Sequence, residues 1–357
     1  MKRYVIRTDI AQAWNASSKA RKDAEAIAYA KGYELICFTG NQSGEGGLKG
    51  KLQLLQQSLR NWRHLYRTID AHAVILVQYP IYPQKSMLWA TVMLPWIRLR
   101  KKAHFVALVH DVNSARNMFG WIGWFGDHCF LRRFDRILCH NSAMQKWLEE
   151  RGIASSKLCT LQLFDYLTEA KASTHCIDDG VAIAGNLEVQ KSGYINALEQ
   201  VLANKVMLHL YGKGYTAGKD TQALWHGAFP PDELPEKLQG AFGLIWDGPS
   251  VEQCEGAMGK YLKFNSPHKA SLYLASGMPL LVWNKAAIAP LVEEWQVGLT
   301  ITSLAEIPEV LSHVTPQQYE QMCEKAEHIG ERLRRGDLLY KALNGVESSM
   351  GDEEGKL

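Results

Sequence analysis

The stretch GKYLKFNSPHKASLYLASGMPLLVW (259–283) contains a helix signal that is followed at once by a strand signal. Polar residues that can cap a helix precede Pro267, which suits the first helical position, and Gly277 fits the carboxyl end. The apolar run LLVW (280–283) is typical of a buried strand. A helix that leads directly into a buried strand indicates an α/β fold with a parallel sheet.

The same alternation of apolar runs and helical patterns extends outward from this stretch. In the first half we expect strands at 4–7, 34–38, 73–78, 105–109 and 136–139, with helices at 17–31, 51–69 and 144–151. In the second half we expect strands at 181–184, 206–211, 243–246, 280–283 and 298–301, with helices at 192–203, 266–276 and 287–294. The predicted fold class is therefore α/β, with two doubly wound sheets.

These elements divide the chain into five parts. We expect a Rossmann-like domain over 1–165, a linker over 166–180, a second Rossmann-like domain over 181–315, helices over 316–345 and a flexible tail over 346–357. A ligand should bind in the cleft between the two domains, facing the carboxyl ends of the strands.

Composition narrows the classes of partner. The 357 residues are 46% hydrophobic and 22% charged, and the net charge of +3 is too small for a protein whose main partner is a nucleic acid. The seven cysteines form no C-x-x-C motif, which favours a reducing, cytoplasmic setting with unpaired thiols. No run of about 18 apolar residues occurs, so we expect no membrane span.

Several classes of site lack their signature in this sequence. Neither G-x-G-x-x-G nor the P-loop motif occurs, which argues against NAD enzymes and P-loop kinases. The D-x-D pair that holds a divalent ion in one class of sugar-nucleotide transferase is absent, as are G-x-S-x-G and zinc-type Cys/His spacing. We therefore expect neither a metal nor an organic cofactor.

Basic residues surround the start of the 266–276 helix. Lys263, His268 and Lys269 lie where the helix dipole is already positive, which costs roughly 0.3–1 kcal/mol per exposed cation unless an anion binds there. Free backbone N–H groups beside Lys and His suit a diphosphate, with Asn265 next to the same site. The alternative is solvated lysines near an ordinary cap. A diphosphate site predicts that Lys269→Ala weakens nucleotide binding and leaves the melting temperature unchanged or slightly raised.

A second basic cluster follows the first predicted strand. Asn15 and Ser18 are candidate caps of the first helix, and Lys19 comes directly after them. This helix start can bind an anion for the same reason. Asp23 lies close by in the sequence, so the alternative is a helix start whose charge is already neutralised.

A third candidate site follows the first strand of the second half. Gly185 lets the backbone approach a ligand closely, Asn186 comes next, and Lys191 follows in the next turn. By itself a Gly-Asn pair is also an ordinary turn signal. All three clusters follow strands, on loops that a doubly wound topology directs towards the cleft.

Tryptophans cluster with basic residues between 89 and 133. Trp96, Trp121 and Trp124 lie near Arg132, Arg133 and a basic run at 98–102. Aromatic residues beside cations can mark a surface that contacts a membrane. The alternative is a place in the core or in a homo-oligomer interface.

The segment 259–289, together with AGNL (184–187), LYGKGY (210–215), LIWDG (244–248) and HDVNS (110–114), resembles bacterial glycosyltransferases of the GT-B fold. The similarity is to β-1,6-galactofuranosyltransferases of surface polysaccharides and to glucosyltransferases that extend adhesin glycans. SKARKD (18–23) is similar to the same group, although Ser17 stands where that group often has a glycine.

The resemblance implies two Rossmann-like domains and transfer of a hexosyl group from a UDP-sugar to a sugar hydroxyl, by an inverting and metal-independent reaction. The acceptor is a growing surface polysaccharide or glycoprotein glycan, which can be lipid-linked, so the enzyme would work at the inner face of the membrane.

Within that reaction, Asp111 fits the catalytic base, with His110 as its competitor, and the alternative for both is a structural role, Asp111 as a loop or helix cap. Asp247 fits either a contact to sugar or ribose hydroxyls or a turn-forming Asp-Gly pair. Tyr211 and Tyr261 lie in the matching motifs. Two alternatives stay open: a sugar-nucleotide epimerase of the same fold, and a catalytically idle partner protein.

Overall fold

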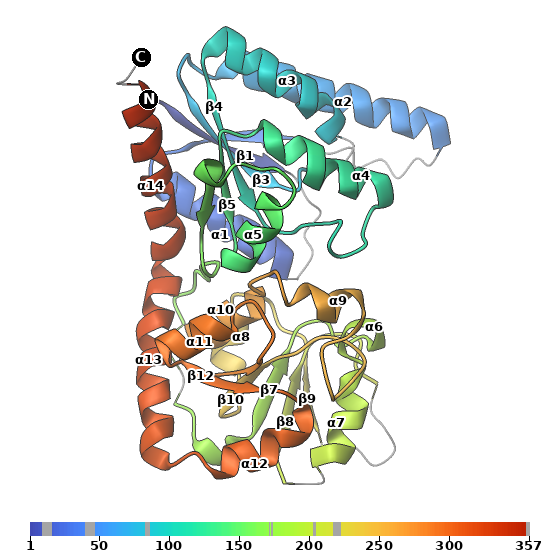
Figure 1. Cartoon of the computed structure of the whole chain (residues 1–357), viewed down its shortest axis with the longest axis vertical. Helices are drawn as coiled ribbons and strands as arrows, with labels where there is room; N and C mark the ends of the chain where they lie inside the picture. The colour runs from blue at the N-terminus through green and yellow to red at the C-terminus, as the bar shows by residue number, and fades with distance from the viewer. Residues whose placement is uncertain are drawn as a thin grey trace.

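The computed structural model describes residues 1–8, 16–39, 47–82, 86–170, 172, 174–202, 205–216 and 223–354. Two domains lie one above the other, and a pair of helices runs along one side of both (Figure 1). All seven cysteines lie in the described part and are unpaired.

The first domain is a six-stranded parallel sheet in the order β2-β1-β3-β4-β5-β6. Its strands are β1 (Arg3–Thr8), β2 (Glu34–Phe38), β3 (Val74–Tyr79), β4 (His104–Val109), β5 (Arg136–Cys139) and β6 (Leu158–Thr160). Its α-helices are α1 (Ala16–Ala30), α2 (Gly47–Thr68), α3 (Ser86–Lys101), α4 (Gly120–Phe125) and α5 (Ser142–Glu149). A π-helical turn, η1 (Gly126–Phe130), and a 3-10 turn, η2 (Leu131–Arg133), follow α4.

The second domain is another six-stranded parallel sheet, in the order β12-β11-β10-β7-β8-β9. Its strands are β7 (Val181–Ala184), β8 (Leu208–Tyr211), β9 (Leu224–Gly227), β10 (Phe242–Ile245), β11 (Leu280–Trp283) and β12 (Gly298–Ile301). Its α-helices are α6 (Val189–Ser192), α7 (Tyr194–Leu202), α8 (Leu234–Lys237), α9 (Gly256–Tyr261), α10 (His268–Ala275), α11 (Ala289–Trp295) and α12 (Ile307–Ser312). The two predicted doubly wound sheets are confirmed.

Both faces of the first sheet are buried, which explains why its strands are continuous apolar runs. Val5 and Leu76 face a layer that contains α1, while Tyr4 and Ile75, on alternate positions, pack with α2 and α3. The apolar cluster on the α1 side continues through Phe164 into the second domain. One core therefore crosses the domain boundary.

Helix α3 was not expected, because the stretch around it contains Pro95. The helix nevertheless spans Ser86–Lys101 with Pro95 inside it. Ala90, Leu94 and Ile97 are fully buried on one side of it. Burial of this face outweighs the loss of one backbone hydrogen bond at proline.

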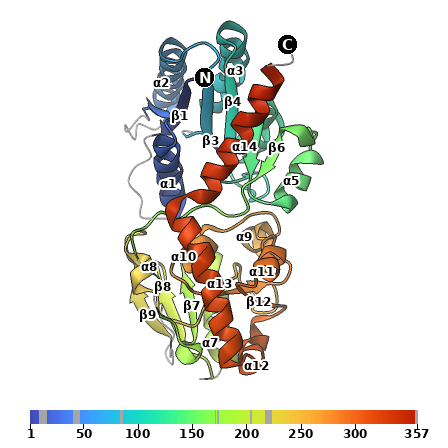
Figure 2. The ribbon, with the colours of Figure 1, turned by 90° about the vertical axis from the view of Figure 1, so that its left-hand side faces the viewer.

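Two long helices, α13 (Pro316–Arg335) and α14 (Asp337–Glu354), return from the second domain to the first (Figure 2). Gly336 ends α13 in the left-handed conformation, and α14 begins directly after it. The predicted flexible tail from 346 is wrong as far as Glu354, because Val346 and Met350 are each only 1% exposed and pack into the core.

Candidate active site

A cleft of about 530 Å³ lies between the two domains. Its first wall comes from the loop after β4 and the segments after β5 and β6, and its second from the loops after β7, β8 and β10 and the start of α10. Strands β7 and β10 are neighbours and mark the point where the strand order of the second sheet reverses. Open α/β sheets bind their ligands at such a point.

Most of the site residues predicted from the sequence meet in this cleft. They are His110, Asp111, Gly185, Asn186, Lys191, Tyr211, Asp247, Tyr261, Asn265, His268 and Lys269. Ser18, Lys19 and Lys263 do not line it, and Asn15 lies outside the described residues.

Lys19 is a structural cation instead of a ligand contact. Its Nζ lies 2.7 Å from Asp23 Oδ1 and 2.7 Å from Asp232 Oδ1, and it also donates to the carbonyl oxygen of Leu167. The side chain is buried and lies over the ring of Tyr166. The ammonium group therefore links α1 to the linker and to the second domain, with its three donors in use.

The start of α10 differs from the prediction. The helix begins at His268, and Pro267 is the extended N-cap residue, without a side-chain cap from Asn265 or Ser266. Lys263 is exposed and lies over the ring of Trp283, outside the cleft. The start of α10 therefore has no side-chain cap, and Pro267, His268 and Lys269 at this point line the cleft.

Ser266 holds the two domains together. Its Oγ accepts from Asn141 Nδ2 at 3.0 Å and donates to the carbonyl oxygen of Gln162 at 2.6 Å. Its backbone N–H donates to His140 Nδ1 at 2.9 Å, while His140 Nε2 donates to the Val109 carbonyl oxygen. No local pattern marks His140 as part of the site, because its partner lies 126 residues away in the sequence.

His268 and Asn265 present unused polar atoms at the cleft. Within the described part of the chain, His268 Nε2 and Asn265 Oδ1 are buried and have no hydrogen-bond partner. Burial lowers the pKa of His268 to about 4, so its ring is neutral near pH 7. His268 is therefore neutral in this structure, whereas the sequence suggested a cation, and its Nε2 has an unused hydrogen-bonding capacity.

Lys269 is paired before any ligand binds. Its Nζ donates to the Trp246 carbonyl oxygen at 2.8 Å and to Asp247 Oδ1 at 3.0 Å. Burial, and to a lesser degree Lys191, lower the pKa of Lys269, while Asp247 opposes them. Lys269 therefore forms an ion pair within the protein and also lines the cleft.

Asp111 is also paired, with a residue that the sequence analysis missed. Arg116 Nη1 lies 2.6 Å from Asp111 Oδ2, and the guanidinium group lies over the ring of Tyr261. The Tyr261 hydroxyl in turn accepts from the Val112 backbone N–H at 2.8 Å. Arg116 follows Asp111 by five residues in the same loop. This short spacing in the sequence could have indicated that the two side chains form an ion pair.

His110 is buried deeper than Asp111. Its Nε2 lies 2.8 Å from Gln78 Oε1, and its ring stacks on Phe164 at 4.9 Å. Burial, with a smaller contribution from Arg21, holds the pKa of His110 well below its usual value. Because burial disfavours the protonated form of this ring, His110 is a weak base.

The charges of the cleft are nearly balanced. Four cations, Arg116, Lys191, Lys213 and Lys269, line it with three carboxylates, Asp111, Glu188 and Asp247. Among the described residues, no cluster of three or more His, Cys, Asp or Glu side chains has the arrangement of a metal site. Likewise, no helix within the described ranges is long and apolar enough to cross a membrane.

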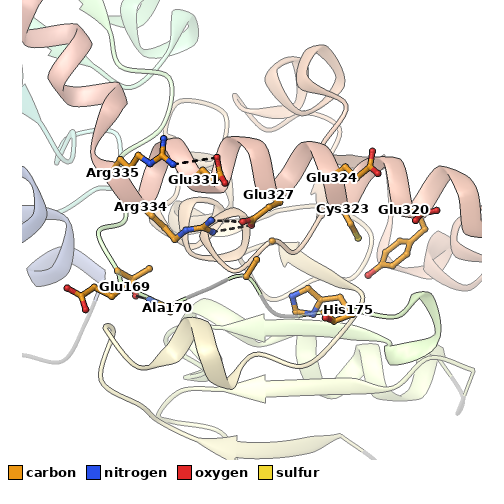
Figure 3. Close-up of a pocket in the computed structure, with 15 residues that line it drawn as sticks. Glu169, Ala170, His175, Glu320, Cys323, Glu324, Glu327, Glu331, Arg334 and Arg335 are labelled. Carbon is orange, nitrogen blue, oxygen red and sulfur yellow. Dashed lines mark hydrogen bonds and ion pairs between the residues drawn. The ribbon is translucent and has the colours of Figure 1, made fainter.

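A larger cavity of about 900 Å³ lies on the other side of the linker, against α13 (Figure 3). Glu320, Glu324, Glu327 and Glu331 come from α13, and Arg334 is paired with Glu327 at 2.6 Å. Its acidic wall does not suit an anionic ligand, so we place the active site in the cleft between the domains.

Comparison with known proteins identifies the family. The family models "Glucosyltransferase 3-like, N-terminal domain" and "Glucosyltransferase 3-like, C-terminal domain" match residues 2–163 and 181–346. The beta-1,6-galactofuranosyltransferase WbbI of Escherichia coli K12 is 32% identical over 271 residues, which are 74% of this chain and 77% of WbbI. Glucosyltransferase 3 of Streptococcus gordonii is 30% identical over 113 residues, 32% of this chain and 33% of that protein.

Among solved structures, Anabaena HepE in complex with UDP has a TM-score of 0.64 at 14% identity, and the alignment covers 98% of this chain and 100% of that chain. This likeness confirms the fold, with two Rossmann-like domains as in GT-B proteins. Since the family models match both domains and the alignment with WbbI covers about three quarters of each protein, the chain belongs to the glucosyltransferase 3-like family of glycosyltransferases.

Proposed function

We propose that this glycosyltransferase moves a hexosyl group, galactofuranosyl or glucosyl, from a UDP-sugar to a sugar hydroxyl of a growing glycan. One observation carries the proposal: the cleft places the carboxylate of Asp111 on one wall, and Lys191 and Lys269 on the other. A base for the acceptor hydroxyl and cations for the leaving diphosphate are the two groups that glycosyl transfer needs. The relatives named above support the UDP-hexose donor.

The donor diphosphate is held by side chains without a metal ion. Lys191 and Lys269 supply charge, and the uncapped N–H groups of α10 supply hydrogen bonds. His268 Nε2 and Asn265 Oδ1 accept from ribose or sugar hydroxyls. Transfer should therefore continue in excess EDTA, whereas loss with EDTA and recovery with magnesium or manganese would contradict this arrangement.

Asp111 is the base of an inverting reaction. Its carboxylate is partly exposed in the cleft, whereas His110 is buried with Nε2 held by Gln78. Arg116 keeps the carboxylate in place until the acceptor hydroxyl arrives. The acceptor oxygen forms a bond to the anomeric carbon of the donor as its proton moves to Asp111. At the same time the bond from the anomeric carbon to the phosphate oxygen breaks, and UDP leaves with that electron pair.

The acceptor is the sugar end of a surface polysaccharide or glycoprotein glycan, either free or lipid-linked. It enters from the first domain, on the side of Asp111. If the acceptor is lipid-linked, the enzyme works at the inner face of the cell membrane. The exposed aromatic residues are also compatible with self-association of the enzyme.

The decisive experiment is product analysis with UDP-glucose and UDP-galactofuranose, each with and without a glycan acceptor. We expect a new glycosidic product with acceptor and only slow hydrolysis without it. Isomerised sugar formed from the donor alone would identify an epimerase. UDP that raises the melting temperature without any turnover on either donor would favour a catalytically idle partner protein.

A further inference from the structure

A short helix of the first domain exposes large aromatic side chains to solvent. On and beside α4, Phe119 is 47% exposed, Trp121 65% and Trp124 54%. Large aromatic residues are seldom left this open on one turn of a protein without a partner surface. None of the three lines the active-site cleft.

A continuous run of contacts joins Trp124 to cations. The Trp124 ring stacks on His128 at 5.0 Å, and His128 meets the edge of Trp147 at 5.9 Å. The Arg151 guanidinium lies 3.5 Å from the centre of the Trp147 ring, and the Arg151 carbonyl oxygen accepts from Arg132. We call these residues, with Phe119 and Trp121, the α4 strip.

The strip lies in a basic segment of the first domain. Residues 98–157 contain eleven Lys and Arg against five Asp and Glu, so this segment carries +6 in a chain whose total is +3. Arg132, Arg133 and Lys146 are exposed, and Asp127 of the same region is buried. Exposed tryptophans beside cations match the interface of an anionic membrane, where the indole rings lie at the headgroups and the cations meet lipid phosphates.

We propose that the α4 strip is the docking surface for an anionic phospholipid membrane. This binding goes beyond the proposed reaction, because it needs neither donor nor acceptor. A bilayer is favoured over a second copy of the chain because the aromatic rings lie among cations that would repel their own copies across a symmetric interface.

The strip is also fixed to the active-site loop. Asp127, in η1 directly after α4, accepts from the Tyr79 hydroxyl at 2.6 Å and from the Ser114 backbone N–H at 2.6 Å. Ser114 belongs to the loop that carries Asp111 and Arg116. A membrane that holds α4 therefore also sets the orientation of the cleft, which is useful for an acceptor that is anchored in lipid.

The test is co-sedimentation of the full chain with vesicles of phosphatidylglycerol and phosphatidylcholine in equal parts, and with vesicles of phosphatidylcholine alone. Binding should be restricted to the anionic vesicles and should weaken with added salt. Trp121→Ser together with Trp124→Ser should lower it at least about tenfold, since two indole rings leave the interface. Arg133→Gln with Lys146→Gln should lower it as well and flatten the salt dependence.

The matched control is Val201→Ser with Met207→Ser, two exposed apolar residues of the second domain. This variant should bind as the wild type does, and every variant should keep its affinity for UDP. No vesicle binding by the wild type, equal binding to both vesicle types, or loss only in this control would overturn the proposal. A wild-type dimer that the tryptophan variant converts to a monomer would instead make the strip an interface between copies. Loss of transfer with vesicle binding intact would contradict the proposed function only.

Discussion

Lys269 serves the fold and the ligand with the same ammonium group. The sequence alone predicts that Lys269→Ala leaves the melting temperature unchanged or raised, but its pairing with Asp247 reverses that expectation. Asp247 is 6% exposed, and a buried carboxylate that loses its partner destabilises the protein by about 3 kcal/mol. We expect Lys269→Ala to lower the melting temperature and to weaken UDP binding by about 1.5–3 kcal/mol.

A double variant separates the two effects. Lys269→Met together with Asp247→Asn removes both charges, so most of the stability should return while UDP binding stays weak. Scanning fluorimetry and calorimetric titration with UDP measure the two quantities. Normal UDP affinity in both variants would move the diphosphate away from α10.

The role of Asp111 as the base can be tested with a substitution that hardly changes the shape of the side chain. Asp111→Asn should lower kcat by about two to four orders of magnitude and leave the affinity for UDP nearly unchanged, because the amide cannot take the acceptor proton. The amide oxygen of the asparagine can still accept a hydrogen bond from Arg116. Near-normal turnover would transfer the role of base to His110 or to another residue.

At the scale of single residues, it was easier to predict which charged side chains lie near the cleft than to predict which partners they contact. Two of the four cleft-lining cations, Lys191 and Lys269, were predicted, because they follow strands whose carboxyl ends meet at one edge, whereas Arg116 and Lys213 were not. Lys19 is paired with Asp23, which is the alternative that the sequence left open, and also with Asp232, which no local pattern reveals. His268 was predicted to be a cation because its burial comes from distant segments.

At the scale of elements, the contribution of α14 to stability can be measured by substitution of one buried and one exposed residue. Leu343 is fully buried on this helix, so Leu343→Ala should destabilise the protein by about 2–5 kcal/mol in urea unfolding. Lys341→Ala, an exposed site two residues earlier, should change stability by less than about 0.5 kcal/mol. Equal effects of the two substitutions would mean that α14 does not pack on the core.

Elements with a regular apolar pattern were predicted within a few residues. Strands β2, β5, β7, β11 and β12 have the bounds expected from the sequence. Helix α3 was missed and the end of α14 was assigned to a tail, because a proline and a weakly apolar stretch hide burial against segments far away in the chain. Tertiary packing overrides local propensity in both places.

At the scale of the whole molecule, the contact between His140 and Ser266 makes the domain interface sensitive to acid. His140 is neutral in the native state: Nε2 donates to Val109 and Nδ1 accepts from Ser266. Burial lowers the pKa of His140 to about 4 from 6.5. The unfolded chain therefore binds a proton that the native chain excludes between these values. The contribution of His140 to stability is complete above about pH 6.5 and is lost as the pH drops towards 4.

The size of this effect is about 3 kcal/mol for one such histidine. The difference in urea stability between the wild type and His140→Gln should decline by this amount as the pH falls from 6.5 towards 4. The total pH dependence also contains His110 and His268, which act in the same direction, and Asp23 and Asp165, whose raised pKa values act in the opposite direction. His64→Gln, at an exposed position, should leave the slope as in the wild type. An unchanged slope in His140→Gln would remove this histidine from the acid response.

The chain passes between the domains twice, through the linker after β6 and through the junction of α13 and α14 (Figure 2). A body attached to another at two points can rotate freely only about the line that joins those points. Opening of the cleft should therefore rotate the second domain about that line, and it must first break the contacts of Ser266 with Asn141 and with the His140 ring. Rotation about other axes is resisted by the two connections.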